Sequence, residues 1–223
     1  MIKFENTEVF NFEGAIRGMR NPLNSWEKSD SYMTYDYSSF EPQEERSELV
    51  EIGPNDMDLA RRLIKAGSDH RKFLRQIFVS VDITAPLYWW KEFDTYKVAT
   101  VANSCSTMHT VHKRDFTRDD FSHEHLLTSN GKAGGPLDTL DLIIADLNYW
   151  KGRFIETKNK EYWWQIIQLL PTSYNQKRTV TLNYETLRNI YGSRRNHKLD
   201  EWCIGFMKWI DSLPYAEELI KFS

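Results

Sequence analysis

Apolar residues recur along the chain with two different periods, and each period predicts a different kind of element. In the stretch QIFVSVDITA, which ends at Ala85, every second residue is apolar on one side: Ile77, Val79, Val81 and Ile83. This alternation predicts a half-buried strand. Elsewhere apolar residues recur every three or four positions, as on one face of a helix. This longer period predicts helices over residues 56–66, 87–96, 162–170 and 183–192, a long one from residue 136, and a last one from about residue 197.

The remaining segments predict shorter or less regular structure. Residues 1–25 suggest a strand followed by a short helix that bears Arg17 and Arg20. The polar run 27–51, rich in Ser and Tyr, predicts an irregular excursion, and residues 130–135 a Gly-rich connection. Residues 97–102 suit a strand or a turn, and residues 180–182 a short extended piece. We therefore expect residues 1–223 to form one helix-rich α+β domain.

Composition narrows the class of protein. The 223 residues include eight Trp, eleven Tyr and twelve Phe, an aromatic share that suits cores, interfaces and stacking on flavins or bases. A net charge of −3 argues against binding of polymeric nucleic acid. Two cysteines give no disulfide framework, and no window approaches the roughly 20 apolar residues that span a bilayer. With no signal-peptide pattern at the N-terminus, we expect a soluble, cytoplasmic protein without a membrane partner.

A run of metal-capable side chains lies in the middle of the chain. Its members are Cys105, His109, His112, His123 and His125. Such ligands can bind zinc or iron, but neither CxxC nor HExxH is present, and spacing alone is weak support. The prediction is a polar loop without metal, and a metal-dependent enzyme built on residues 105–125 remains an alternative.

Cys105 is also a candidate nucleophile. It lies in the sequence NSCST, close to His109 and His112. A thiol becomes reactive when a base or a positive field lowers its pKa. An inert cysteine is the commoner outcome, and closeness in sequence does not establish closeness in space. Both interpretations stay open.

A cationic cluster follows the helix predicted at 183–192. Arg194, Arg195, His197 and Lys198 lie just past Gly192, and the helix itself carries Asn183 and Asn189. Cations at a helix C-terminus often only complement the helix dipole. A second polar segment far away in sequence, at residues 89–109, makes a shared pocket the alternative.

The order of these elements resembles that of the flavin-dependent thymidylate synthases. That family opens with a strand and a helix bearing an Arg–x–Ser element, for which Arg20 and Ser25 are candidates. It continues through a helix and a Gly-His-containing turn, matched here by His70. A strand then leads into Ala-Pro, as it does at Ala85 and Pro86.

The signature of the family, RHRxxSxxExSxRY, comes shortly after that proline. An ungapped alignment places Thr95-Tyr96-Lys97 under RHR, Thr100 under the first Ser, Asn103 under Glu, Cys105 under the second Ser, and Thr107-Met108 under Arg-Tyr. Lys97 is thus the one cation that the signature keeps in this sequence.

The C-terminal half is similar to the family over more positions. There the family has Leu-Pro, an Asn-x-Arg-x-Leu helix, a second Asn, Leu-Arg and a His. The matching residues are Leu170-Pro171, Asn183 to Leu187, Asn189, Ser193-Arg194, and His197 or Lys198. Glu185 stands where the family has Arg.

The resemblance implies a flavin-dependent thymidylate synthase-like fold, helix-rich with a small antiparallel sheet. It implies transfer of a one-carbon unit from methylenetetrahydrofolate to C5 of a pyrimidine deoxynucleotide (dUMP to dTMP or a close variant), with FAD as cofactor and NADPH as reductant. The implied substrate-binding residues are Lys91, Lys97, Thr100, Cys105, Ser106 and Arg194. The implied cofactor-binding residues are Arg20, His70, Lys97, Asn103, Asn183, Asn189 and His197.

No residue is implied as a catalytic nucleophile, and the family forms homotetramers with sites between subunits. Because the signature arginines are missing, an alternative is a protein of the same fold that binds a nucleotide or flavin without turnover.

Overall fold

A computed structural model describes residues 2–35, 48–129 and 134–222. These residues form two compact units, each assembled from three segments of the chain. The first unit consists of the described residues within Met1–Glu5, Asp82–Thr95 and Ala102–Thr179, and the second of those within Asn6–Val81, Tyr96–Val101 and Val180–Ser223.

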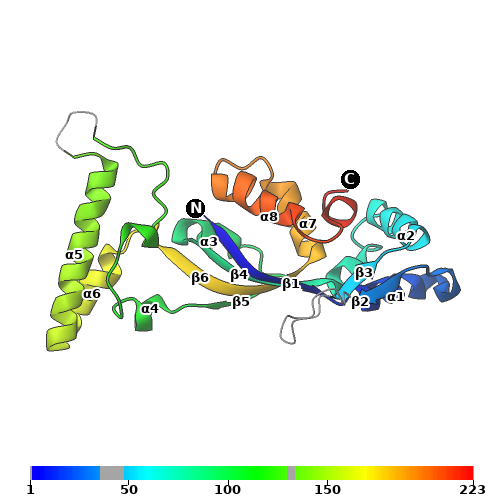
Figure 1. The fold of residues 1–223 in the computed structure, drawn as a ribbon, viewed down its shortest axis with the longest axis horizontal. Helices are drawn as coiled ribbons and strands as arrows, with labels where there is room; N and C mark the ends of the chain where they lie inside the picture. The colour runs from blue at the N-terminus through cyan, green and yellow to red at the C-terminus, as the bar shows by residue number, and fades with distance from the viewer. Residues whose placement is uncertain (1, 36–47, 130–133, 223) are drawn as a thin grey trace. The chain divides into compact units, whose positions relative to one another are not determined.

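A four-stranded antiparallel sheet contributes residues to both units (Figure 1). Its strand order is β1 (Lys3–Phe10), β4 (Phe78–Pro86), β6 (Asn175–Asn183) and β5 (Val101–Ser104). The strand predicted from QIFVSVDITA is confirmed as β4, because Ile77, Val79, Val81 and Ile83 are fully buried. The extended piece expected at 180–182 is part of the longer strand β6. The prediction was too short because Asn175–Thr179 are polar yet pair within the sheet.

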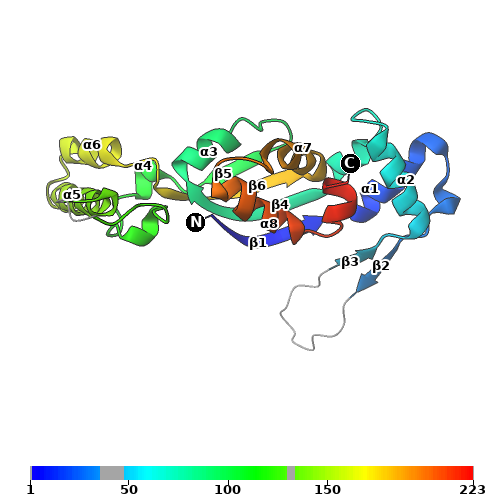
Figure 2. The same ribbon diagram turned by 90° about the horizontal axis from the view of Figure 1, so that it is seen from above.

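The first unit is mainly helical outside the sheet. Its helices are α3 (Leu87–Phe93), α4 (Thr107–Thr110), the 3-10 turn η4 (Arg118–Asp120), α5 (Pro136–Thr157) and α6 (Lys160–Leu169). Helices α5 and α6 lie side by side (Figure 2). Their inner faces and the loops beside them bury one apolar cluster: Val111, Phe116, Phe121, Leu140, Leu147 and Ile166.

The second unit combines longer helices with short turns. Its helical elements are α1 (Phe12–Arg20), η1 (Asn21–Leu23), η2 (Trp26–Lys28), α2 (Pro54–Lys65), η3 (Lys72–Gln76), α7 (Tyr184–Arg194), η5 (Glu201–Phe206), α8 (Met207–Asp211) and η6 (Ala216–Ile220). The helix expected from about residue 197 is thus a π-helical turn, η5, that continues into α8. No described helix is long and apolar enough to cross a membrane.

One prediction about this unit was wrong. Residues 27–51 were expected to be irregular, but β2 (Tyr32–Tyr35) pairs antiparallel with β3 (Glu48–Glu51). Each strand has only four residues, too few for an alternating pattern to stand out, although the sequence YMTY of β2 contains strand-favouring residues. Residues 36–47 of this run, and residues 130–133 of the predicted Gly-rich connection, lie outside the described residues.

A buried ion pair holds α1 against α2. Nε of Arg20 donates to Oδ1 of Asp56 at 2.7 Å, and both side chains are almost fully buried. The other carboxylate oxygen of Asp56 accepts hydrogen bonds from the hydroxyls of Ser29 (2.7 Å) and Ser31 (2.6 Å). Burial alone would raise the pKa of Asp56, but the hydrogen bonds from Ser31, Ser29, Arg20 and the Asp30 amide together lower it.

We predict that Asp56→Asn destabilises the protein by about 3–5 kcal/mol at pH 7, because it leaves the Arg20 charge buried and unpaired. The folded-state pKa of Asp56 lies below its unfolded value, so its stabilising contribution is present above the unfolded pKa and is lost as the pH falls through the folded pKa. Urea unfolding of both proteins between pH 7 and pH 3 should therefore show a difference that narrows in acid.

Asp58→Asn is the matched control, since Asp58 forms an exposed ion pair with Arg62 at 3.0 Å. Its removal should cost less than about 1 kcal/mol. Equal losses of stability in the two variants would show that burial of the Asp56 pair is not what stabilises this part of the unit.

Candidate functional site

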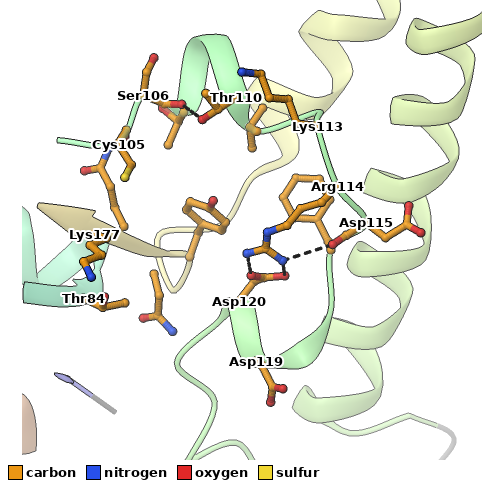
Figure 3. Close-up of a pocket in the computed structure, with 16 residues that line it drawn as sticks. Thr84, Cys105, Ser106, Thr110, Lys113, Arg114, Asp115, Asp119, Asp120 and Lys177 are labelled. Atoms are coloured by element: carbon orange, nitrogen blue, oxygen red, sulfur yellow. Dashed lines mark hydrogen bonds and ion pairs between the residues drawn. The ribbon is translucent and has the colours of Figure 1, made fainter. Parts of the chain in front are cut away.

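A cavity of about 470 Å³ in the first unit, here called the Cys105 cavity, is a candidate site (Figure 3). Figure 3 shows Cys105 and Lys177 on one side of it, and Arg114 paired with Asp120 on the other. The lining residues are Thr84, Cys105, Ser106, Thr107, Thr110, Val111, Lys113, Arg114, Asp115, Phe116, Asp119, Asp120, Tyr174, Asn175, Gln176 and Lys177.

Two hydrogen bonds to its backbone groups hold Cys105 on the lining of this cavity. The amide of Cys105 donates to the carbonyl of Lys177 at 2.9 Å, and Nε2 of Gln176 donates to the carbonyl of Cys105 at 2.8 Å. The end of β5 is therefore tied to β6 on both sides of the residue. Ser106 then begins α4, because its hydroxyl accepts a hydrogen bond from the amide of His109.

The charged groups of the cavity are largely paired within the chain. Arg114 donates two hydrogen bonds to the buried carboxylate of Asp120. Nζ of Lys177 lies 3.2 Å from Glu5 and 3.1 Å from Asp82, and hydrogen bonds to these two carboxylates raise the pKa of Lys177. Lys113 is exposed and forms no ion pair with any described residue. A ligand phosphate in this cavity would therefore meet Lys113 as its most available cation.

Neutral donors complement these charges. Burial, followed by the nearby Asp120 carboxylate, raises the pKa of Tyr174, so its phenol stays protonated and can donate. Within the described part of the chain this hydroxyl has no hydrogen-bond partner. Oδ1 of Asn175 accepts from the hydroxyl of Ser122 at 2.9 Å, which leaves its amide N–H groups for a ligand. Such donors suit the carbonyl oxygens of a planar, polar ring.

The predicted residues of the first unit divide between this cavity and the surface. Cys105 and Ser106 line the cavity, whereas Lys91 on α3 and Asn103 on β5 are exposed and do not. The hypothesis of a nucleophilic Cys105 gains no support, because no hydrogen bond joins its thiol to His109 or His112 among the described residues. Sequence reasoning did not single out Lys113, Tyr174 or Asn175.

The other predicted residues lie in the second unit. The guanidinium of Arg194 lies 5.6 Å from the ring centre of Tyr96 and 5.1 Å from that of Trp202, and its Nε donates to the Tyr96 hydroxyl at 2.8 Å. Lys97 is exposed. The buried hydroxyl of Thr100 makes no hydrogen bond within the described residues.

The two predicted asparagines differ sharply in their surroundings. Asn183 is 2% exposed and caps α7: its Oδ1 accepts from the amide of Thr186 at 2.9 Å, and its Nδ2 donates to the carbonyl of Arg75. The predicted cap is thus confirmed, and this amide is engaged within the fold. Asn189 is exposed on the same helix. Nδ1 of His197 accepts a hydrogen bond from the amide of Leu199.

Glu185, which occupies the position of a family arginine, is buried against a cation. Nε of Arg71 donates to both carboxylate oxygens, at 3.2 and 3.0 Å. The side chains of both residues are largely buried. Arg71 therefore neutralises the acid, and the departure from the family pattern is accommodated locally.

The two predicted cofactor residues near α1 line different cavities. His70 lines one of about 550 Å³, here called the His70 cavity, together with Gly18, Met19, Asn21, Pro22, Leu23, Leu63, Asp69, Lys72, Phe73 and Gln76. Arg20 lines another, together with Glu13, Ile16 and Arg17. Residues 13, 16, 17 and 20 share one face of α1 and residues 18 and 19 the other, so the structure separates Arg20 from His70.

The metal-capable run does not gather into a site. In residues 2–35, 48–129 and 134–222, no group of three or more His, Cys, Asp and Glu side chains is placed to hold a metal ion. His112 packs edge-on against Phe154 at 5.1 Å, and Nδ1 of His123 lies 2.9 Å from the carbonyl of Phe121. The metal-dependent alternative therefore gains no support from this structure.

No protein-family model and no curated protein matches the sequence. Solved structures do match. Thymidylate synthase X (ThyX) from Helicobacter pylori with FAD and dUMP has a TM-score of 0.67 at 15% identity, covering 99% of this chain and 98% of that one. A second structure of flavin-dependent ThyX from Helicobacter pylori, complexed with FAD and dUMP, has a TM-score of 0.69 at 14% identity over 98% of both chains.

A third structure widens the range of chemistry on this fold. The UMP/dUMP methylase PolB from Streptomyces cacaoi, bound with 5-Br UMP, has a TM-score of 0.61 at 15% identity, covering 100% of this chain and 95% of that one. The predicted flavin-dependent thymidylate synthase-like fold is therefore confirmed across the chain. At this identity the likeness establishes the fold alone.

Proposed function

We propose that this protein is a flavin-dependent enzyme that transfers a one-carbon unit to C5 of a pyrimidine nucleotide, dUMP or a close variant. The observation that carries the proposal is the full-length likeness in fold to two dUMP-complexed ThyX structures and a UMP/dUMP methylase. The chemistry of the Cys105 cavity is compatible with such a substrate, because its neutral donors suit the carbonyl oxygens of a pyrimidine.

In this proposal the Cys105 cavity takes the pyrimidine nucleotide. Cys105 and Ser106 form a wall, and the Tyr174 phenol and Asn175 amide donate hydrogen bonds to the ring. Lys113 meets the phosphate as a point charge. Arg194, Lys97, Thr100 and Lys91 do not line this cavity, and substrate-binding roles for them rest on the family resemblance alone.

The flavin is assigned to the residues of the second unit that the resemblance implies. The His70 cavity suits part of FAD: Met19, Leu63 and Phe73 offer apolar surface to a planar ring, and His70 and Lys72 offer donors to a pyrophosphate. Lys97, Asn189 and His197 are the other residues of this unit that the proposal assigns to the flavin. The amide of Asn183 is engaged within the fold and Arg20 lines a different cavity, so the flavin roles of these two, like that of Asn103 in the first unit, rest on the family resemblance alone. When bound, FAD supplies the electron and one-carbon transfer chemistry, and the chain supplies binding and orientation.

NADPH, methylenetetrahydrofolate and a homotetrameric state complete the proposal by analogy with the family. Exposed apolar side chains on α5 are compatible with assembly: Leu142 is 69% exposed and Tyr149 is 59% exposed, seven residues apart on one face.

The direct test is a visible spectrum of the purified protein, followed by turnover of dUMP with methylenetetrahydrofolate and NADPH. We expect the absorption bands of bound flavin and formation of dTMP, measured by mass spectrometry. A protein that binds dUMP tightly, carries no flavin even when FAD is added and yields no methylated nucleotide would instead be a binding protein on the same fold.

Tyr174→Phe tests the assignment of the Cys105 cavity. Loss of one neutral hydrogen bond costs about 0.5–1.5 kcal/mol, so kcat/KM for the nucleotide should fall about twofold to tenfold while the flavin content stays constant. Tyr149→Phe is the control, since Tyr149 is exposed on α5 and does not line the cavity. Identical kinetics for the two variants would remove Tyr174 from substrate recognition.

Arg194→Ala tests the role carried over from the family. If Arg194 binds the substrate phosphate, calorimetric titration with dUMP should show about tenfold to hundredfold weaker binding, because a charge-assisted hydrogen bond contributes about 1.5–3 kcal/mol. Arg195→Ala is the control: this neighbour is exposed and lies over Tyr191 at 5.6 Å. Unchanged dUMP affinity in Arg194→Ala would leave that guanidinium with a packing role between Tyr96 and Trp202.

A further inference from the structure

The second unit contains a cavity of about 370 Å³, here called the Trp26 cavity, on the opposite face of α1 from the His70 cavity. Its lining residues come from α1 and from the segment that leads into β2: Glu13, Ile16, Arg17, Arg20, Trp26, Ser29, Ser31 and Tyr32. None of these residues is used in the reaction proposed above. For Arg20, which lies on a different cavity from His70, the role argued here replaces the flavin contact that the family resemblance implies.

Two aromatic side chains of this cavity are open to solvent. Trp26 is 50% exposed and Tyr32 is 61% exposed. Nε1 of Trp26 donates to Oδ1 of Asn21 at 2.8 Å, which fixes the indole in place. Oriented, exposed aromatic rings offer stacking surfaces to a planar ligand, and stacking on a nucleobase is tolerant of base identity.

The cationic part of the cavity is built on a buried arginine with spare donors. The Arg20 side chain is 5% exposed, and its hydrogen bonds within the described residues are from Nε to Asp56 and from Nη2 to the carbonyl of Lys28. A guanidinium has five N–H donors, so three remain. Because Arg20 lines the cavity, a ligand anion can reach this buried group.

Arg17 adds a second cation that is easily recruited. It lies 3.8 Å from Glu13 one helical turn away, with both side chains 67% exposed, and such a pair contributes little to stability. A phosphate could therefore replace Glu13 as the partner of Arg17. The hydroxyls of Ser29 and Ser31 donate to Asp56. The oxygen of Ser31 also accepts from the amide of Gly53 at 3.1 Å, so that of Ser29 is the more available acceptor in the cavity.

We propose that the Trp26 cavity binds a nucleoside monophosphate, with the base stacked against Trp26 and Tyr32 and the phosphate held by Arg17 and Arg20. Ribose hydroxyls find acceptors in Glu13 and Ser29. The volume lies within the range of small-molecule sites. This site is independent of the nucleotide that is methylated, and its stacking surfaces do not select a pyrimidine.

The test is calorimetric titration of the full chain, in excess FAD, with GMP, whose base is neither a pyrimidine nor adenine. We expect Arg17→Gln to weaken GMP binding about tenfold to hundredfold, and Trp26→Leu to weaken it about fivefold to hundredfold. The matched controls, Arg62→Gln and Trp164→Leu, should bind GMP as the wild type does. Arg62 has the same kind of exposed helical ion pair as Arg17, and Trp164 is 41% exposed on α6.

Guanosine, inorganic phosphate and benzoate serve as partial ligands. Each should bind more weakly than GMP. No GMP binding at millimolar concentration, or equal losses in Arg17→Gln and Arg62→Gln, would overturn the proposal. Phosphate binding as tightly as GMP would make the cavity a simple anion site, and tighter binding of benzoate an aromatic-carboxylate site; either result also overturns it. Flavin content and dUMP turnover are measured separately, so failure of the methylation proposal would not be confused with these outcomes.

Discussion

The cost of burying charge shapes the parts of this structure that bear on function. A carboxylate removed from water must be met by an opposite charge, and three buried carboxylates here are each met by an arginine. Asp56 pairs with Arg20, Asp120 with Arg114, and Glu185 with Arg71, joining residues that lie 36, 6 and 114 positions apart. These pairs fix α1 against α2, brace the wall of the Cys105 cavity, and anchor the start of α7 to the turn after α2.

The same pairs decide which groups are left for a ligand. Arg114 and Lys177 line the Cys105 cavity but already face carboxylates, so their charge is largely compensated before any ligand arrives. The groups that remain include Lys113, the exposed carboxylate of Asp119, the Tyr174 phenol and the Asn175 amide. A site of this kind recognises a polar ring through hydrogen bonds more than through net charge. Arg20 differs, because within the described residues its side chain donates to one carboxylate, that of Asp56, and to one carbonyl, that of Lys28. Three of its five N–H donors are left unused.

The sequence allowed prediction of elements whose pattern is local. Strand β4 alternates with a period of two, helix α2 repeats its apolar residues along one face, and Asn183 carries the signal of an N-cap; all three are confirmed. The pair β2–β3 was missed because each of its strands has only four residues, and the polar half of β6 because its sheet neighbours, β4 and β5, lie about 70 residues or more earlier in the chain. Local sequence contains no direct record of such pairing.

The candidate site residues likewise divide into those that the sequence pointed to and those that only the folded chain reveals. The family resemblance led to Cys105 and Ser106, and the structure places both on one cavity. Tyr174 and Asn175 could not be predicted in this way, since they reach the same cavity from a segment about 70 residues later, brought there by the hydrogen bonds between Cys105 and β6. Their residue types are also unremarkable by themselves: the raised pKa of Tyr174 depends on burial and on Asp120, which only the folded chain supplies.

Glu185 shows how the fold can persist while binding chemistry changes. At the family's arginine position an acid would be costly if it were alone, but Arg71 lies beside it and donates to both of its oxygens. The pair is neutral as well as buried, so the acid costs the fold little. It also engages the guanidinium of Arg71, which is then not available to a ligand. A likeness in fold at 14% or 15% identity is thus compatible with a different distribution of available charge, and the ligand is selected by that distribution.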